Sequence, residues 1–407
     1  MIPRLKAYLG KEEILAVLKN RKHAVQRFEQ AFAVQFHSNY AVAFPYGRSA
    51  LWAFFKAMGI KDAEIVQPAY TCSVVAHATV LSGNIPVFVD IDLTDYNMNL
   101  DLFADAINER TRAVIPTHLF GYPMDIDKVQ KIVKDAEVKY GHKIYIIQDC
   151  AHSFNARYKG KPVANAGDGA IFGLGISKQI TSIFGGIFTT NNEVIAKKIR
   201  DFRDKNFRKP PRKKSLLRYL YLLAIYPAFQ PTIYGLVYWM QEKTSFLNHL
   251  TKAYHLDEKI HFPPDYLDQM TNIEALVGLE QLKKYMAVRS KRIEIAKKYF
   301  NEIHSTNEWV LPLEINGATY SHFVIRTNAR DRLLESFASQ GIQLGQLIEY
   351  SMPHQYSYKK YAEDKLFPNS YLCSMSMINL PIYPNLTNIN IDRITSLLLL
   401  YLDNHEK

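Results

Sequence analysis

Short apolar runs rich in β-branched residues alternate with segments of helical periodicity between residues 40 and 200. The runs are apolar almost without interruption, as in strands that are buried on both faces of a sheet. Their alternation with helices indicates βαβ units and a mainly parallel sheet, in which ligands bind at the carboxyl ends of the strands. The expected strands are 64–67, 86–91, 113–117, 143–148, 170–174 and 186–190, and the expected helices are 49–58, 73–82, 100–109 and 126–140.

A second region begins near Thr271. Residues 273–303 keep apolar residues at helical spacing over many turns, which predicts a long helix linking two domains. A strand at 321–326, a helix at 330–340, a loop rich in Tyr and Pro and a final helix at 391–402 are expected to follow. The expected fold class is therefore α/β. We expect a large α/β domain at 1–204, a basic and apolar insertion at 205–265, and the long linking helix with a smaller C-terminal α+β domain at 266–407.

The composition fits a globular protein. The 407 residues can form a full core and two domains, and 48% apolar with 22% charged residues excludes wholesale disorder. Three cysteines without paired or metal-ligand spacing indicate a reducing compartment, no disulfide framework and no metal site. The first 22 residues carry charges throughout, so we expect no secretory signal and a cytoplasmic protein.

Residues 205–240 combine a basic run with an apolar segment. Part of the net charge of +11 lies in KNFRKPPRKK at 205–214, which indicates an anionic partner surface or a solvated loop. The segment 216–240 has one charge, Arg218, and Pro227 and Pro231 make an unbroken spanning helix difficult to build. Two short helices lying peripherally on the inner membrane face and an apolar arm against a second subunit both fit the pattern. We expect no nucleic-acid partner, because stacking aromatics on a β platform are missing.

Two polar signals stand where strands meet helices. Gly47, Arg48 and Ser49 open an apolar helix, where N–H groups and the helix dipole suit a phosphate, although any capped helix shows this pattern. Asp149 ends an apolar strand, where its carboxylate could pair with a cationic ring nitrogen or simply cap the next segment. His152 follows in the same loop.

A third signal is Lys178, in an almost uncharged run before Gly185 and Gly186. Most lysines are solvated, but a lysine in an apolar, partly dry site has a lowered pKa and can attack an aldehyde. The two glycines allow a close backbone approach. Tyr70 to Cys72 joins a strand to a helix and could present a side chain to a planar ring.

A phosphate site, a carboxylate for a ring nitrogen and a nucleophilic lysine, in that chain order on an α/β domain, describe a site for pyridoxal phosphate. The longer motifs of the chain are GRSAL (47–51), PAYTC (68–72), PVFVDID (86–92), RTRAVIPTHLFGYPMDID (110–127), QDCAHSFNA (148–156), GDGAIFGLGISKQITSIFGG (167–186), IEALVGLEQL (273–282) and LPIYPNLT (380–387). On these motifs, and over nearly its whole length, the chain resembles the DegT/DnrJ/EryC1/StrS family of pyridoxal-phosphate-dependent sugar aminotransferases of fold type I.

The resemblance implies catalytic roles for three residues. Lys178 would hold the cofactor covalently and later move the proton. Asp149 would keep the pyridine nitrogen protonated, so that the ring can accept electrons. His152 would lie near the ring face and its phenolic oxygen.

The resemblance also implies how the rest of the cofactor is bound. Gly47, Arg48 and Ser49 match the phosphate-binding segment, with Arg48 where relatives often have Thr, so that a charge-assisted bond would replace a hydroxyl. Cys72 stands where relatives have a ring-stacking aromatic, and Tyr70 could supply that contact.

The activity implied is transfer of an amino group from L-glutamate to a keto-sugar, expected to be nucleotide-linked, in the biosynthesis of cell-surface polysaccharide, lipopolysaccharide or glycolipid. A homodimer is implied as well, and His322, Tyr350 and His354 match segments that shape substrate pockets in relatives. The alternatives are transamination of a non-sugar or lipid-linked ketone, and a non-catalytic sensor or scaffold that keeps the cofactor fold.

Overall fold

The computed structural model describes residues 1–18, 22–243, 259–362 and 365–405, and its largest feature is a seven-stranded sheet in the order β1-β9-β8-β5-β4-β2-β3. Strands β3, β2, β4, β5 and β8 run parallel, whereas β9 is antiparallel to both of its neighbours. The predicted α/β class with a mainly parallel sheet is confirmed. The strands are β1 (Tyr40–Phe44), β2 (Glu64–Pro68), β3 (Ile85–Val89), β4 (Thr111–Val114), β5 (Tyr145–Asp149), β8 (Gly169–Gly173) and β9 (Gly186–Thr190).

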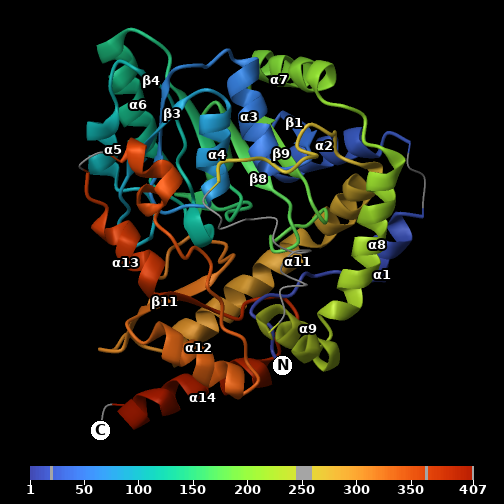
Figure 1. Cartoon of the computed structure of the whole chain (residues 1–407), viewed down its shortest axis with the longest axis vertical. Coiled ribbons are helices and arrows are strands. Elements are labelled where there is room, and N and C mark those ends of the chain that lie inside the picture. Colours follow the sequence, from blue (N-terminus) through green and yellow to red (C-terminus); the bar gives the residue numbers. More distant parts are fainter. Residues whose placement is uncertain (19–21, 244–258, 363–364, 406–407) are drawn as a thin grey trace.

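Helices cover both faces of this sheet (Figure 1). They are α2 (Ala24–Gln35), α3 (Gly47–Ala57), α4 (Ser73–Leu81), α5 (Leu100–Ala106), α6 (Ile126–Tyr140), α7 (Glu193–Asn206) and α11 (Asn272–Glu302). Successive strand residues point to opposite faces. In β1, Val42 lies in one buried cluster with α3 and α7, whereas Ala41 and Ala43 lie in another with α2 and α11. In β2, Ile65 lies in the cluster with α3 and α4, whereas Val66 lies in the cluster with α5 and α6.

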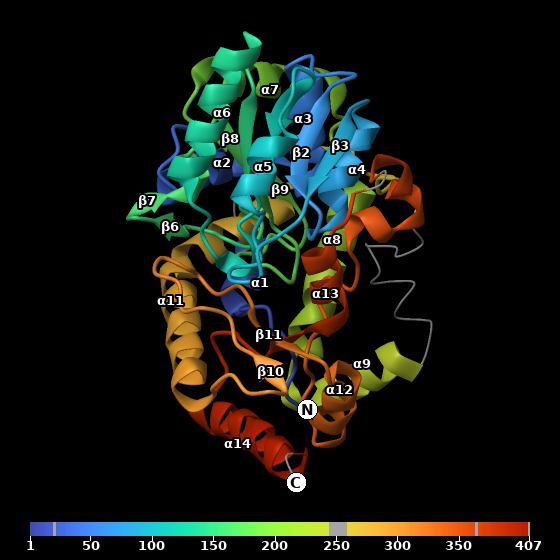
Figure 2. The same cartoon turned by 90° about the vertical axis from the view of Figure 1, so that its left-hand side faces the viewer.

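A smaller antiparallel sheet lies at the other end of the molecule (Figure 2). Its order is β10-β11-β12, and Ile2 joins the same region, because its N–H donates to the carbonyl of Gly341 at 2.8 Å. The elements of this part are β10 (Trp309–Val310), β11 (Phe323–Thr327), β12 (Met377–Leu380), α12 (Arg330–Ser339), α13 (Pro368–Ser376) and α14 (Asn388–His405). The sequence division at residues 204 and 265 remains a prediction.

Helix α11 connects the two sheets, as the sequence predicts. Thr271 and Glu274 close its first turn with a capping box, each accepting a hydrogen bond from the other's backbone N–H. Near its start, Gly278 lies so close to Phe28 that a Cβ would be 2.5 Å from the ring. Near its end, Ala296 and Tyr299 belong to the core of the smaller region.

The sequence analysis missed several elements, chiefly short ones. The strands β1 and β12 were not predicted, and their strand geometry depends on pairing with β9 and β11, which lie far away in the chain. Helices α2 and α7 were not predicted either. The expected loop rich in Tyr and Pro contains two short 3-10 helices and α13. The remaining short elements are α1 (Lys11–Ala16), β6 (Arg157–Tyr158), β7 (Lys161–Pro162) and the 3-10 helices Leu119–Gly121, Val163–Asn165, Met352–His354 and Tyr356–Tyr361.

The basic and apolar segment folds into α8 (Arg212–Ala228) and α9 (Pro231–Lys243). Pro227 stands in the last turn of α8 and Pro231 opens α9, so the predicted break into two short helices is confirmed. Within the described ranges, no single helix is long and apolar enough to cross a membrane. The pair formed by these two helices meets the length and composition criteria together, but is bent by 115°.

His118 is a fully buried histidine in the connection that follows β4. Its Nδ1 accepts a hydrogen bond from the backbone N–H of Met124 at 3.0 Å, and its Nε2 lies 2.9 Å from the side-chain oxygen of Gln148. The ring is therefore neutral, with its proton on Nε2. Burial lowers the pKa of His118 to about 4, against a smaller opposite effect of Gln148.

We expect the protein to lose stability as the pH falls below about 6.5, because the unfolded His118 binds a proton that the folded ring excludes. Between pH 7.5 and pH 5 this one group contributes a loss of about 2 kcal/mol. In His118→Asn the amide oxygen can still accept from Met124, but nothing titrates. Its thermal midpoint should be lower at pH 7.5 and fall less steeply toward pH 5 than that of the wild type. If the thermal midpoints of the two proteins fell equally between pH 7.5 and pH 5, this account would be contradicted.

Candidate active site

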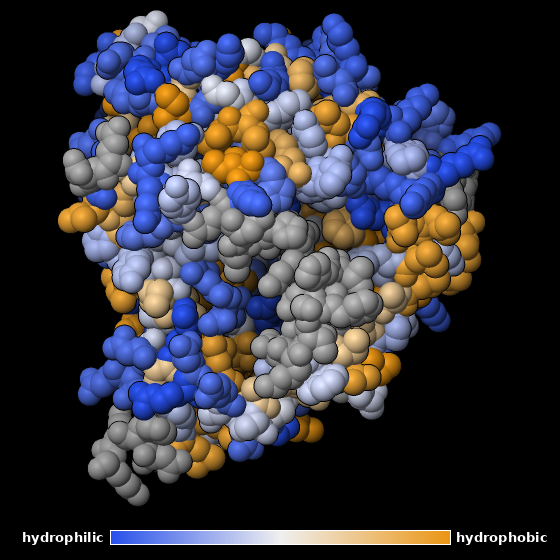
Figure 3. Space-filling model, viewed as in Figure 1, coloured by the Kyte–Doolittle hydropathy of each residue, from blue (hydrophilic) through white to orange (hydrophobic). Residues whose placement is uncertain are grey.

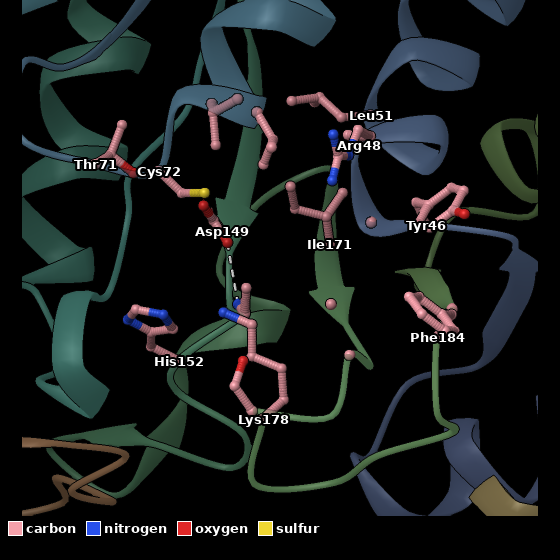
Figure 4. A pocket seen from close by; sticks show the side chains of 18 of the residues that line it. Tyr46, Arg48, Leu51, Thr71, Cys72, Asp149, His152, Ile171, Lys178 and Phe184 are labelled. Atoms are coloured by element: carbon pink, nitrogen blue, oxygen red, sulfur yellow. Dashed lines mark hydrogen bonds between the residues drawn. The ribbon is translucent and has the colours of Figure 1, made fainter. Parts of the chain in front are cut away.

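A pocket of about 250 Å³ opens at the carboxyl ends of the parallel strands. Figure 4 shows its side chains converging from the start of α3, the start of α4, the end of β5 and the loop after β8. One residue of the predicted set, Ser49, is not part of the lining. The predicted site residues that do line the pocket are Gly47, Arg48, Cys72, Asp149, His152 and Lys178.

Asp149 is the last residue of β5 and lies beside Ile171 of the neighbouring parallel strand β8. It is 4% exposed, and its Oδ1 accepts a hydrogen bond from the backbone N–H of Ala151 at 3.0 Å. Burial raises the pKa of Asp149, whereas the Ala151 N–H and the charge of Lys178 oppose that rise. The carboxylate thus organises the following turn and still faces the pocket.

Lys178 stands in the loop after β8, and its backbone N–H donates to the carbonyl of Gly175 at 3.0 Å. Its side chain is partly buried and reaches into the pocket (Figure 4). Burial lowers the pKa of Lys178, while Cys72 and Asp149 pull it back up. A lowered pKa increases the neutral, nucleophilic fraction of the amine.

The start of α3 forms the opposite wall. The N-cap residue Tyr46 has extended backbone geometry and no side-chain capping bond, and the first helical hydrogen bond runs from Ala50 to the Tyr46 carbonyl. The N–H groups of the first turn therefore stand outside the helical pattern. The guanidinium of Arg48, a residue only 7% exposed, lies 5.5 Å from the centre of the Tyr46 ring and lines the pocket. A helix N-terminus beside a buried cation suits a phosphate group.

Gly186 lets β9 lie directly against this turn. A Cβ at Gly186 would be 2.2 Å from the nitrogen of Gly47 and 2.3 Å from the carbonyl carbon of Tyr46. Real side chains never make such contacts, so any other residue would displace the turn. The sequence predicts a close backbone approach at Gly185 and Gly186, and at Gly186 the approaching backbone is the turn from β1 into α3.

Two of the residues considered for the cofactor face elsewhere. The hydroxyl of Ser49 donates to the carbonyl of Tyr266 at 3.0 Å, so its side chain points away from the pocket. Tyr70 is fully buried, donates to the carbonyl of Ile348 at 3.2 Å and does not line the pocket, so the suggested ring contact from Tyr70 is wrong. Cys72, the N-cap residue of α4, does reach the lining.

His152 lies on the left side of the pocket in Figure 4. Its Nδ1 accepts from the backbone N–H of Phe120 at 3.4 Å, and its ring centre is 4.9 Å from that of His322. Burial, with the nearby charge of Lys178, holds the pKa values of both histidines well below their usual range. His152 is therefore a neutral ring that carries its proton on Nε2.

The residues expected to shape the substrate pocket lie farther out. His322 packs behind His152, and the hydroxyl of Tyr350 accepts a hydrogen bond from the backbone N–H of Ser73 at 2.9 Å. His354 is exposed, with its ring 4.9 Å from that of Tyr371. None of the three expected residues lines the pocket itself, and their roles remain predictions.

Two threonines line the pocket: Thr71, from the segment that was expected to present a side chain to a planar ring, and Thr117, which was not predicted from the sequence. The hydroxyls of Thr71 and Thr117 are buried and have no hydrogen-bond partner among the described residues. Buried hydroxyls are normally satisfied, so both indicate a polar ligand. Thr117 could have been found from its position, because it ends an apolar run as Asp149 does.

One wall of the pocket contains a charged network. The hydroxyl of Tyr46 donates to Asp265 at 2.7 Å, and Arg218 donates to Asp265 at 3.0 Å and to Tyr46 at 3.3 Å. The guanidinium of Arg218 also lies 4.0 Å from the centre of the Phe184 ring, and Tyr221 of α8 completes the wall. No sequence motif pointed to this contribution from α8.

The residues present fit pyridoxal phosphate. Lys178 offers an amine for its aldehyde, Asp149 a carboxylate for its ring nitrogen, and the start of α3 with Arg48 a site for its phosphate. The two unpartnered threonine hydroxyls add polar groups for a bound ring. Fold and site together define a pyridoxal-phosphate-dependent transferase of fold type I.

The sequence profile of the DegT/DnrJ/EryC1/StrS aminotransferase family matches residues 11–399, and the chain belongs to this family. It is therefore a pyridoxal-phosphate-dependent aminotransferase, and the family is one of sugar aminotransferases.

Curated relatives match most of the chain. An uncharacterized protein of Methanocaldococcus jannaschii is 29% identical over 412 residues, covering 95% of this chain and 94% of the relative. GDP-perosamine synthase of Escherichia coli O157:H7 is 26% identical over 380 residues, covering 91% of this chain and 88% of the enzyme. Among solved structures, Helicobacter pylori PseC, an aminotransferase of pseudaminic acid biosynthesis, has a TM-score of 0.76 at 20% identity, with 98% of each chain covered.

We expect Gly186→Ala to weaken pyridoxal phosphate binding by at least about tenfold, because the added Cβ must push the Gly47 turn out of place. Fluorescence titration of the cofactor-free protein with pyridoxal phosphate measures the affinity. Gly235→Ala is the matched control, since its Cβ would meet only Met1 at 3.9 Å. Equal affinities of the two variants would show that the close approach is not needed.

Proposed function

We propose that this aminotransferase moves the amino group of L-glutamate to a keto-sugar carried on a nucleotide, as a cytoplasmic homodimer that serves cell-surface polysaccharide or glycolipid biosynthesis. The observation that carries the proposal is the presence of Lys178 and Asp149 in one pocket beside the start of α3. The relatives GDP-perosamine synthase and PseC support a sugar acceptor by their names.

Pyridoxal phosphate, when bound, supplies an aldehyde and an electron-withdrawing ring. Lys178 is placed to take the proton from the α carbon of the amino donor and to return one to the new amine-bearing carbon of the acceptor. Its pKa, lowered by burial, suits a base that works near neutral pH. Asp149 would keep a proton on the ring nitrogen of the bound cofactor, because its negative charge favours the protonated form.

The other polar groups position the cofactor and do not take part in the reaction themselves. Arg48 and the first N–H groups of α3 hold the phosphate, which fixes the ring relative to Lys178. His152 stays neutral, so it can donate a hydrogen bond from Nε2 without adding a positive charge near the lysine. Over a full cycle an amino acid and a keto-sugar give an oxo acid and an amino sugar, and no external oxidant is needed.

We expect Lys178→Ala to reduce turnover by at least about a thousandfold, because both the covalent anchor and the proton-moving base are lost. The absorption band of the holoenzyme, which depends on the lysine, should vanish in the same variant. Asp149→Asn should keep the band and still lose at least about a hundredfold in turnover. The control is Lys161→Ala, since this exposed lysine pairs with Asp127 and is not part of the pocket lining. Normal turnover of Lys178→Ala would refute its assignment.

We expect nucleotide-linked keto-sugars to be aminated with a kcat/KM at least about a hundredfold higher than simple oxo acids offered with the same glutamate donor. Mass spectrometry of the products and initial rates under both conditions provide the measurement. A preference for simple ketones would show that the acceptor is not a sugar, but it would leave the proposed role of Lys178 unchanged. Absence of turnover with any acceptor would favour a sensor or scaffold.

A further inference from the structure

Helix α8 carries its ion-paired charges on the face that is turned toward the protein. Lys214 is 7% exposed and its Nζ lies 2.9 Å from Asp265 and 3.6 Å from Asp268. Arg218, one turn later, lies 3.0 Å from Asp265 and 2.9 Å from the fully buried Glu274 at the start of α11. These ion pairs fix the orientation of α8 on the body of the enzyme.

The outer face of α8 is apolar. Leu216, Leu217 and Leu220 are 56%, 52% and 50% exposed, and the exposed Leu223 continues the same stripe one turn later. Figure 3 shows hydrophobic surface at the right-hand edge of the molecule, where Figure 1 places α8. Helix α9 also has exposed apolar residues, namely Ile233, Leu236 and Trp239. A water-facing helix normally has the opposite arrangement, with apolar residues inward and charges outward, so this face indicates a partner.

Exposed cations stand at the start of the stripe. Arg212 and Lys213 precede Leu216 and Leu217 by four residues each, so they lie on the same face of α8. The positive end of the helix dipole disfavours cations in the first turn of α8. This turn nevertheless carries cations and contains no acidic residue that would neutralise them. The other exposed cations of the preceding segment are Lys205, Arg208, which pairs with Asp268, and Lys209.

We propose that the outer face of α8, with the cations at its start, docks on an anionic phospholipid surface. Leucines would enter the boundary between headgroups and acyl chains, and Arg212 and Lys213 would meet the phosphates. A second copy of this chain is the less suitable occupant, because α8 contains no acidic residue that could meet Arg212 and Lys213 across a symmetric interface. This docking does not depend on which acceptor the enzyme uses.

The docking face and the pocket wall are two sides of one helix. Tyr221 lines the pocket from α8, and it follows Leu220 directly in sequence. Arg218 connects the same helix to Tyr46 and Phe184 in the pocket wall. Docking therefore brings the active site close to the membrane surface without moving the catalytic residues.

Flotation of the holoenzyme with phospholipid vesicles tests the proposal. The wild type should float with phosphatidylcholine vesicles that contain about 30% phosphatidylglycerol and not with phosphatidylcholine alone. Two variants should lower the bound fraction by about tenfold or more: the triple change Leu216→Ser, Leu217→Ser and Leu220→Ser, and the double change Arg212→Gln and Lys213→Gln. The second variant removes only exposed charges, so it tests docking even if the first folds poorly.

Matched changes on other surfaces are the controls. Val34→Ser, Val138→Ser and Val194→Ser alter three exposed apolar residues, and Lys134→Gln with Lys139→Gln alters two exposed cations of α6. Both controls should float like the wild type, and all variants should keep wild-type turnover of soluble substrate, which separates this test from that of the proposed function. Flotation that is absent, or that the α8 variants do not reduce, overturns the proposal. A shift from dimer to monomer in the leucine variant, measured by light scattering, would instead assign the face to a second copy.

Discussion

Two opposite charges in one partly apolar pocket are the constraint on which the site depends. Burial alone would drive Asp149 toward its protonated form and Lys178 toward its neutral form, and each charge restrains the shift of the other. The order of strands brings the side chains of Asp149 and Lys178 into one pocket. Since β5 and β8 are parallel neighbours, Asp149 at the end of one strand lies beside Ile171 of the other, and the loop after β8 brings Lys178 back to it.

The end of the pocket at the start of α3 depends on backbone shape more than on charge. The turn from β1 into α3 lies against Gly186 at a separation that leaves no room for a Cβ. Because β9 is antiparallel between β1 and β8, its first residue reaches both the turn and the strand that leads to Lys178. A change at this glycine would therefore alter the distance between the start of α3 and the amine of Lys178, although Gly186 carries no functional group.

Much of this arrangement could be predicted from the sequence, because it depends on local patterns. The apolar runs predicted the parallel strands. The position of Asp149 could be predicted because it is the last residue of one of these runs. The direction in which each side chain points could not be predicted in the same way. Ser49 belongs to the right turn, yet its hydroxyl donates to Tyr266, which lies 217 residues away in the chain. The hydroxyls of Thr71 and Thr117 gain significance only because the folded pocket leaves them without partners within the described residues.

The segment that was hardest to interpret from sequence shows most clearly why composition is not enough. Leucines and basic residues in 205–240 fitted a membrane surface and a subunit contact equally well. In the fold, Lys214 and Arg218 turn inward to Asp265 and Glu274, while Leu216, Leu217 and Leu220 remain exposed on the face that also carries Arg212 and Lys213. Arg218 pairs with a carboxylate at the start of α11 and also contacts the pocket wall, so it couples the position of α8 to the site. A rigidly held helix with an apolar outer face needs no rearrangement to bind a surface, and the cost in conformational entropy of such binding is correspondingly small.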